Sequence, residues 1–323
     1  MRELFIFGAG ASHASGGIPL GKELVWNCYE DCSTMYQIGP DGYHPAKADL
    51  EEKRKDFADF IDFLRKMQDR YPALPGIVQK LNKAMEVGEF FDLDIEKPYY
   101  IDEIMEDLIR NAEYADEIHL IRRIAAQHIA QSSCGQNNGY YKRFVKSLKN
   151  KTREEVSIIS FNFDCLLRDD LDDRIYFDYL IEFKEIDSRK CFYKPGQGIP
   201  LLKLHGSLDW RLDVLTGYLT LLPAEWHENY GGEPCIFLPH EQANKKIDQL
   251  WEAAPEFVRH AEKITFIGYS LPPYDQDAIR LFQSNVHKGI RIEVIDSSEA
   301  TIDRFKKLFP NSVIEGTIRD LSI

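Results

Sequence analysis

A short apolar run that leads directly into glycine is the feature that most constrains this chain. Leu4–Phe7 reads as a fully buried strand, and Gly8, Ala9 and Gly10 follow it at once. Glycines at this place let the backbone approach a diphosphate, and the start of the next helix supplies N–H groups and partial positive charge. The sequence therefore predicts an anion-binding loop at the edge of a sheet.

The loop departs from the fingerprint of dinucleotide-dependent dehydrogenases. That fingerprint requires a third glycine and, about 20 residues on, an acidic residue at the end of a second strand. Here position 13 is His, and Glu30 and Asp31 lie in a helical pattern. A hydride-transfer enzyme is therefore disfavoured. The alternative for the loop alone is a turn whose glycines only permit tight packing.

Two kinds of pattern follow the loop. From about 46 to 149, apolar residues recur at helical spacing, as in DFADFIDFLRKMQDRY, where Phe57, Phe60, Ile61 and Leu64 share one face. After Lys151, short apolar runs such as VSIIS, LLKL, CIFLP, KITFI and IRIEVI return, with helical patterns at 244–260 and 300–309. The alternation predicts an α/β fold with a Rossmann-like parallel sheet and helices on both faces. We expect one domain, 1–323, with a large helical insertion at about 46–149.

Composition excludes several classes of function. The net charge of −13 disfavours a nucleic-acid or membrane-surface binder. No apolar run approaches the roughly 20 residues that span a bilayer, and no secretion signal is recognisable, so we expect a cytoplasmic protein. The six cysteines form no C-x-x-C pair, and the histidines have no metal-ligand spacing. We therefore expect reduced thiols and no metal site.

Four further stretches carry polar residues where predicted strands end, which is where ligands bind in open α/β sheets. SFNFD offers Asn162 and Asp164, and KLHGS offers His205. The other candidates are Gly268, Ser270 and Asp275 in FIGYSLPPYD, and Asp296 in VIDSS.

Together these stretches resemble the motifs of the sirtuin (silent-information-regulator) superfamily, in that family's order, over about 1–22 and 155–300. GAGASHASGGIP resembles its glycine loop, FNFD its Asn and Asp motif, LHGS its catalytic-His motif, GYSL its Gly-x-Ser segment and VIDSS its ribose-contacting segment. The resemblance implies that the chain binds NAD. It assigns the pyrophosphate to Gly8, Ala9, Gly10 and Ser12, phosphate and ribose contacts to Gly268 and Ser270, and the adenosine ribose to Asp296.

Departures from the sirtuin deacylases narrow the resemblance. Leu20-Gly21-Lys22 follows GIP in place of an Asp-Phe-Arg type sequence, and only Cys235 lies beyond Cys191, so the two zinc-binding Cys pairs are missing. No FGE-type peptide-docking segment follows Trp210. The combination resembles the prokaryotic sirtuin-like NAD hydrolases, many of which are anti-phage defence effectors. It implies a homo-oligomer and activation by a protein partner or a phage-derived trigger.

Cleavage of the nicotinamide–ribose bond passes through an oxocarbenium-like transition state, and nicotinamide leaves as a neutral molecule. His205 is the candidate base, because a neutral imidazole accepts a proton near pH 7. Asn162 has the donor and acceptor groups to position water and a ribose hydroxyl, and Asp164 would orient Asn162 or stabilise developing positive charge. The structural alternatives are that Asn162 and Asp164 only cap a turn and that Asp296 only caps a helix.

Two other functions remain open. The same pocket would serve a protein deacylase or an ADP-ribosyltransferase, which the missing zinc cysteines oppose. A non-catalytic module that senses NAD or ADP-ribose is the third hypothesis, and the presence of both Asn162 and His205 speaks against it. The leading hypothesis is hydrolysis of NAD to nicotinamide and ADP-ribose.

Overall fold

The chain divides into two compact units in this computed structural model. One unit comprises Met1–Leu20 and Ile129–Ile323, and the other comprises Gly21–His128. The structure describes residues 2–16, 58–69, 74–87, 140–169, 175–186, 193–213, 215–221, 233–237, 245–273 and 275–318, with single positions at 118, 122, 125, 126 and 129.

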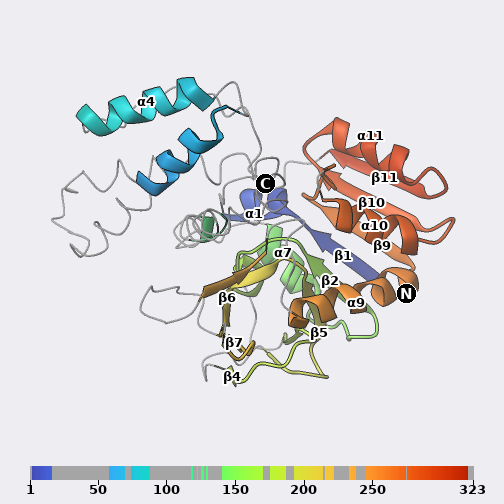
Figure 1. The fold of residues 1–323 in the computed structure, drawn as a ribbon. Helices are drawn as coiled ribbons and strands as arrows, with labels where there is room; N and C mark the ends of the chain where they lie inside the picture. The colour runs from blue at the N-terminus through green and yellow to red at the C-terminus, as the bar shows by residue number, and fades with distance from the viewer. Residues whose placement is uncertain are drawn as a thin grey trace. The chain divides into compact units, whose positions relative to one another are not determined.

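The first unit is built on a seven-stranded sheet in which every pairing is parallel (Figure 1). Its strands, in spatial order, are β11 (Val313–Ile318), β10 (Arg291–Asp296), β9 (Lys263–Ile267), β1 (Glu3–Phe7), β2 (Val156–Ser160), β5 (Ile199–Lys203) and β3 (Phe177–Asp178). In β1, Phe5 pairs with Ile158 on one side and with Thr265 on the other. This central position explains the unbroken apolar run of Leu4–Phe7.

Helices cover both faces of this sheet. They are α1 (Ala9–Gly16), α7 (Tyr140–Ser147), α8 (Leu166–Asp169), α9 (Lys245–His260), α10 (Gln276–Asn285) and α11 (Glu299–Leu308). Phe5 and Phe7 contact Phe144 of α7, whereas Phe266 of β9 points to the other face and contacts α10 and α11. The predicted α/β fold with a covered parallel sheet is confirmed, and α9 and α11 lie close to the predicted ranges.

The strand order reverses at β1. The chain passes from β1 to β2 and β5 on one side of the sheet, and β9, β10 and β11 extend the sheet from the other side of β1. Ligands of open α/β sheets bind outside the carboxyl ends of the strands at such a point. The glycine loop after β1 and the GYSL segment after β9 meet there.

A second, four-stranded sheet in this unit was not predicted. Its order is β4 (Glu185–Ile186), β7 (Leu219–Leu221), β6 (Gly206–Leu212) and β8 (Glu233–Ile236). The CIFLP run, expected in the parallel sheet, instead begins within β8, which pairs antiparallel with β6. A short apolar run has no feature that distinguishes the two pairings. Trp210 fills the core of this sheet against Tyr179 and Phe183.

The second unit is described at two helical segments, 58–67 and α4 (Leu74–Val87). Phe60, Ile61 and Leu64 are buried as the helical spacing predicted, and Phe63 is buried as well. Phe57, the helical pattern that contains Glu30 and Asp31, and most of the pattern at about 46–149 lie outside the described residues. The insertion at about 46–149 stays a prediction, and α7, within that range, belongs to the first unit.

Across the part of the chain that the structure describes, no helix is both long and apolar enough to cross a membrane.

Candidate functional site

The glycine loop packs directly against the end of β9. Gly8 N donates to Ile267 O (3.1 Å), and Gly10 N donates to Gly268 O (2.9 Å). Gly268 has φ +57°, and a Cβ there would lie 2.2 Å from Ala11 N, while a Cβ on Gly8 would lie 2.5 Å from Tyr269 Cβ. The glycines are therefore required by the close approach of two backbone segments. The glycines therefore have the tight-packing role that the sequence offered as the alternative for this loop.

This packing limits which amides of the loop can reach a diphosphate. The N–H groups of Gly8 and Gly10 donate to β9 and its extension, and Ala11 N donates to Gly8 O (3.0 Å). Ala9 is exposed at the first position of α1, where a helix offers its amide no internal acceptor. An anion at this loop would therefore bind the Ala9 end of α1 rather than the two glycine amides.

Asn162 is fixed to the loop by a buried polar cluster of four residues, Gly8, Ser12, Tyr141 and Asn162, here called the Asn162 cluster. Asn162 Nδ2 lies 2.8 Å from Gly8 O, 2.8 Å from Ser12 Oγ and 3.0 Å from the Tyr141 hydroxyl. A carbonyl oxygen only accepts, so the amide nitrogen must face Gly8. Asn162 Oδ1 therefore points away from the cluster, and no described residue bonds it.

Tyr141 was not identified from the sequence. Its hydroxyl lies 2.9 Å from Ser12 Oγ, and its backbone N donates to Ser15 Oγ (3.3 Å). Burial and then the charge of Asp164 raise the pKa of Tyr141, so the hydroxyl stays protonated. Ser12, predicted to contact pyrophosphate, has its Oγ committed to this cluster. The sequence signal for Tyr141 was only a tyrosine on the apolar face of YYKRFVKS.

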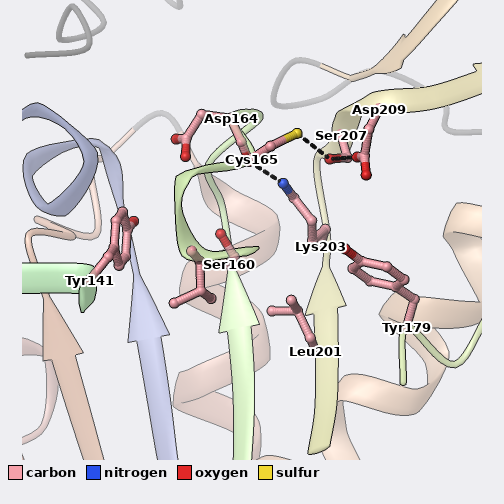
Figure 2. Close-up of a pocket in the computed structure, with 10 residues that line it drawn as sticks. Tyr141, Ser160, Asp164, Cys165, Tyr179, Leu201, Lys203, Ser207 and Asp209 are labelled. Atoms are coloured by element: carbon pink, nitrogen blue, oxygen red, sulfur yellow. Dashed lines mark hydrogen bonds between the residues drawn. The ribbon is translucent and has the colours of Figure 1, made fainter. Parts of the chain in front are cut away.

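Asp164 lines a small pocket at the carboxyl ends of β2 and β5 (Figure 2). Asp164 Oδ1 accepts from Leu166 N (3.0 Å), so the turn-capping alternative is present. Lys203, buried at the end of β5, points at the turn and donates to the backbone oxygens of Asp164 and Phe163. Lys203 holds this turn and was not identified from the sequence.

His205 lies in the turn between β5 and β6. Gly206 has φ +81°, and a Cβ there would lie 1.9 Å from Cys235 O, which explains the glycine of LHGS. The imidazole packs edge-on against Phe161 (ring centroids 5.2 Å apart), and its Nε2 lies 3.7 Å from Asp275 Oδ2. Burial lowers the pKa of His205, and the nearby carboxylates oppose this shift only in part. The imidazole is therefore neutral near pH 7, as a base requires.

Arg304 of α11 interacts with a predicted residue after β9, Ser270, and its charge acts on a predicted residue after β10, Asp296. Arg304 Nη1 donates to Ser270 O (3.2 Å). Asp296 Oδ1 accepts from Ser298 N (2.8 Å) in the turn before α11, and Ser298, the N-cap residue, makes no side-chain cap hydrogen bond, so the helix-capping alternative is present only as this turn. Burial raises the pKa of Asp296, and hydrogen bonds with Ser298, Thr301 and Ser297, followed by the charge of Arg304, lower it.

The predicted site residues thus gather at one edge of the sheet in two groups. Asn162 faces α1 and α7, whereas the neighbouring Phe161 faces Trp251 of α9 and Phe282 of α10 and contacts His205. No hydrogen bond joins Asn162 to His205 in this part of the structure. The two candidate catalytic side chains therefore approach the edge from opposite faces of the sheet.

The residues that the structure describes contain no group of three or more His, Cys, Asp or Glu side chains that could hold a metal ion. Cys165 and Cys235 are buried and form no disulfide with another described residue. The other four cysteines lie outside the described residues.

No protein-family model and no curated protein matches the chain. Among solved structures it is similar to a Sir2 homologue in complex with NAD, at 12% identity and a TM-score of 0.49, over 99% of this chain and 85% of the other. Mutant Sir2 homologues with 2′-O-acetyl ADP-ribose and with ADP-ribose are similar at 13% identity and TM-scores of 0.48 and 0.46, each over 99% of this chain and 87% of the other. At these TM-scores the likeness does not decide what this chain binds.

Proposed function

We propose that this chain is an NAD glycohydrolase, which cleaves NAD to nicotinamide and ADP-ribose. The observation that carries the proposal is the Asn162 cluster. It fixes a side-chain amide to the glycine loop at the carboxyl edge of the sheet and leaves Asn162 Oδ1 as a hydrogen-bond acceptor. A neutral, buried His205 at the same edge supplies a base.

In the proposed reaction, the bond between the ribose C1′ and the nicotinamide nitrogen breaks, and nicotinamide leaves as a neutral molecule with the bonding electron pair. The oxygen of a water molecule forms the new bond to C1′. Asn162 Oδ1 accepts a hydrogen bond from this water or from a ribose hydroxyl. His205 takes one proton, which then passes to solvent, and the carboxylate of Asp164 stabilises positive charge that develops on the ribose.

The rest of the dinucleotide would lie at the edge of the sheet beside β1, where the strand order reverses. The exposed Ala9 end of α1 would bind the diphosphate, with partial positive charge from the helix. Ser270 would add a hydroxyl, and Asp296 would bind the adenosine ribose in addition to holding the turn before α11. Gly8, Gly10 and Gly268 contribute by shape, because a side chain at any of them would displace the loop.

We further propose that the activity is regulated and that the chain is an NAD-depleting effector of the anti-phage type. We infer that it works as a homo-oligomer and responds to a protein partner or a phage-derived trigger. The support is the sequence resemblance, in particular the GIPLGKEL and FNFD forms and the missing zinc cysteines.

The proposal is tested by nicotinamide release from NAD and by cellular NAD loss on expression. The parent is compared with Asn162→Ala, His205→Ala and a matched control, His260→Ala, whose imidazole is exposed beside Glu256. We expect the first two variants to lose NAD consumption and the control to retain it. If Asn162→Ala and His205→Ala consume NAD as fast as the parent, the site assignment is wrong. Turnover only with an acetylated peptide would indicate a deacylase, and binding without turnover would indicate a sensor.

A further inference from the structure

One carboxylate lies against the imidazole of His205. Asp275 Oδ2 is 3.7 Å from His205 Nε2, and both side chains are buried. Asp275 precedes α10, so it reaches His205 from the helical face opposite the Asn162 cluster. The FIGYSLPPYD stretch drew attention to this residue, but neither the motifs nor the proposed reaction assigns it a task.

Both oxygens of Asp275 are held. Oδ1 accepts from Ala278 N (3.2 Å) and caps α10, and Oδ2 accepts from the Tyr269 hydroxyl (2.6 Å). The Tyr269 ring is itself fixed, because it stacks on Phe161 with ring centroids 4.3 Å apart and an interplanar angle of 8°. The carboxylate therefore cannot swing away from the imidazole without losing these two hydrogen bonds.

We propose that Asp275 and Tyr269 are positioning residues for His205: Asp275 receives the Nε2–H of the imidazolium that forms when His205 takes a proton, and Tyr269 holds Asp275 in place. This inference rests on the proposed function, in which His205 is the base. Asp275 does not touch the reacting atoms.

The 3.7 Å separation has a physical reason. A distance of this length is not a hydrogen bond, and a neutral imidazole does not need one. An imidazolium carries N–H on both ring nitrogens, whichever nitrogen took the proton, so Nε2 then becomes a charged donor facing a carboxylate. The attraction is strengthened by burial, because the effective dielectric constant is lower than in water.

The groups around His205 determine the direction of the expected pH effect. Asp275, then Asp277, and then a hydrogen bond with the Phe161 backbone raise the pKa of His205. The aromatic rings of Phe161, Phe163 and Trp251 also lie around the imidazole and carry no charge. Burial lowers the pKa of His205, and Asp275 is the largest influence that raises it. Removing the charge of Asp275 should therefore lower this pKa further.

Asp275→Asn is the matched substitution, because asparagine keeps the shape and caps helices as well as aspartate. Its amide nitrogen replaces Oδ2 and donates to the Tyr269 hydroxyl oxygen, so the contact is kept without the charge. Tyr269→Phe removes the hydroxyl and keeps the ring on Phe161. Without that donor Asp275 Oδ2 is no longer held against the imidazole, so the carboxylate attracts the imidazolium less. Asp277→Asn is the control, since Asp277 is two residues along and is paired with Arg280.

The experiment is an NMR titration of the His205 imidazole in the full chain, assigned with His205→Gln, alongside pH profiles of nicotinamide release. We expect Asp275→Asn to lower the pKa of His205 and to move the acid limb of the profile to lower pH. The rate constant should fall about 10- to 100-fold while KM stays nearly unchanged. Tyr269→Phe should lower the pKa of His205 by less than Asp275→Asn does, and Asp277→Asn should have the smallest effect.

The outcomes separate the inference from the proposed function. If the parent releases nicotinamide and Asp275→Asn leaves both the His205 pKa and the acid limb unchanged, the positioning role is wrong and the function stands. If the parent releases none under triggered conditions but the pKa shifts as expected, the function is wrong and the charge pairing stands. Should Asp275→Asn fail to fold, an unchanged His205 pKa in Tyr269→Phe overturns the inference.

Discussion

The Asn162 cluster and the surroundings of His205 hold their side chains in different ways. The Asn162 cluster, on the α1 and α7 face, is a closed set of neutral hydrogen bonds among Gly8, Ser12, Tyr141 and Asn162. His205, on the α9 and α10 face, lies among aromatic rings beside one carboxylate. The first arrangement sets geometry, and the second sets a proton affinity. We therefore expect only the His205 side to respond to pH.

The largest expected effect comes from the glycine that joins the loop to β9. Gly268→Ala places a Cβ 2.2 Å from Ala11 N at φ +57°, so the loop must move and the Asn162 cluster with it. We expect the free energy of unfolding to fall by about 3 kcal/mol or more, measured by denaturant unfolding. Gly289→Ala is the control, since Gly289 has φ +81° with nothing within 4 Å, and should cost only about 1 kcal/mol. Equal costs would refute the close-approach argument.

Tyr141→Phe tests the neutral cluster alone. The ring contact with Phe7 is kept, but Asn162 and Ser12 each lose a hydrogen-bond partner. We expect the free energy of unfolding to fall by about 1–3 kcal/mol and the rate of nicotinamide release to fall with it. The pH profile should keep the parent's shape, because burial raises the pKa of Tyr141 away from the working range. A shifted acid limb would show that the two sides are not separate.

The pH dependence of the parent tests the His205 side. The neutral imidazole is the active form, so the rate is full above the pKa of His205 and falls as the pH drops through it. Burial lowers this pKa, so activity should persist below the usual value of about 6.5. The pH at which the rate falls is found by measuring nicotinamide release from about pH 4.5 to about pH 8. A rate that already falls well above about pH 6.5 would contradict the claim that burial lowers the pKa of His205.

The smallest effect is expected at the adenosine end. Asp296→Asn keeps the bond from Ser298 N in the turn before α11, so the free energy of unfolding should change by less than about 0.5 kcal/mol. If Asp296 also binds a ribose hydroxyl, KM for NAD should rise about 3- to 10-fold with little change in the rate constant. An unchanged KM would leave Asp296 with the turn alone.

The sequence was sufficient for features that depend on local pattern. Apolar runs located the parallel strands β1, β2, β5, β9 and β10 but not the edge strand β11, and strand-end motifs located Asn162, His205 and Gly268 at one edge. It was not sufficient for partners far apart in the chain. Tyr141 meets Ser12 across 129 residues, and the Lys203 ammonium reaches the Asp164 carbonyl from a strand 39 residues on. Such contacts follow from packing, which periodicity does not encode.

Ser12 and the glycine amides show the same limit. A Gly-x-Gly loop predicts that its N–H groups face a ligand, yet Gly8 and Gly10 donate to the end of β9 and its extension, and Ser12 bonds Tyr141 and Asn162. The motif predicted where the loop lies correctly. Which atoms of the loop remain free depends on the neighbouring strand.

The most direct test of the account is nicotinamide release from NAD by the full chain, with Asn162→Ala and His205→Ala measured at equal folded concentration. The account predicts stoichiometric nicotinamide and ADP-ribose from the parent and a loss of at least about 100-fold in each variant. Parent-like NAD cleavage by both variants would contradict it.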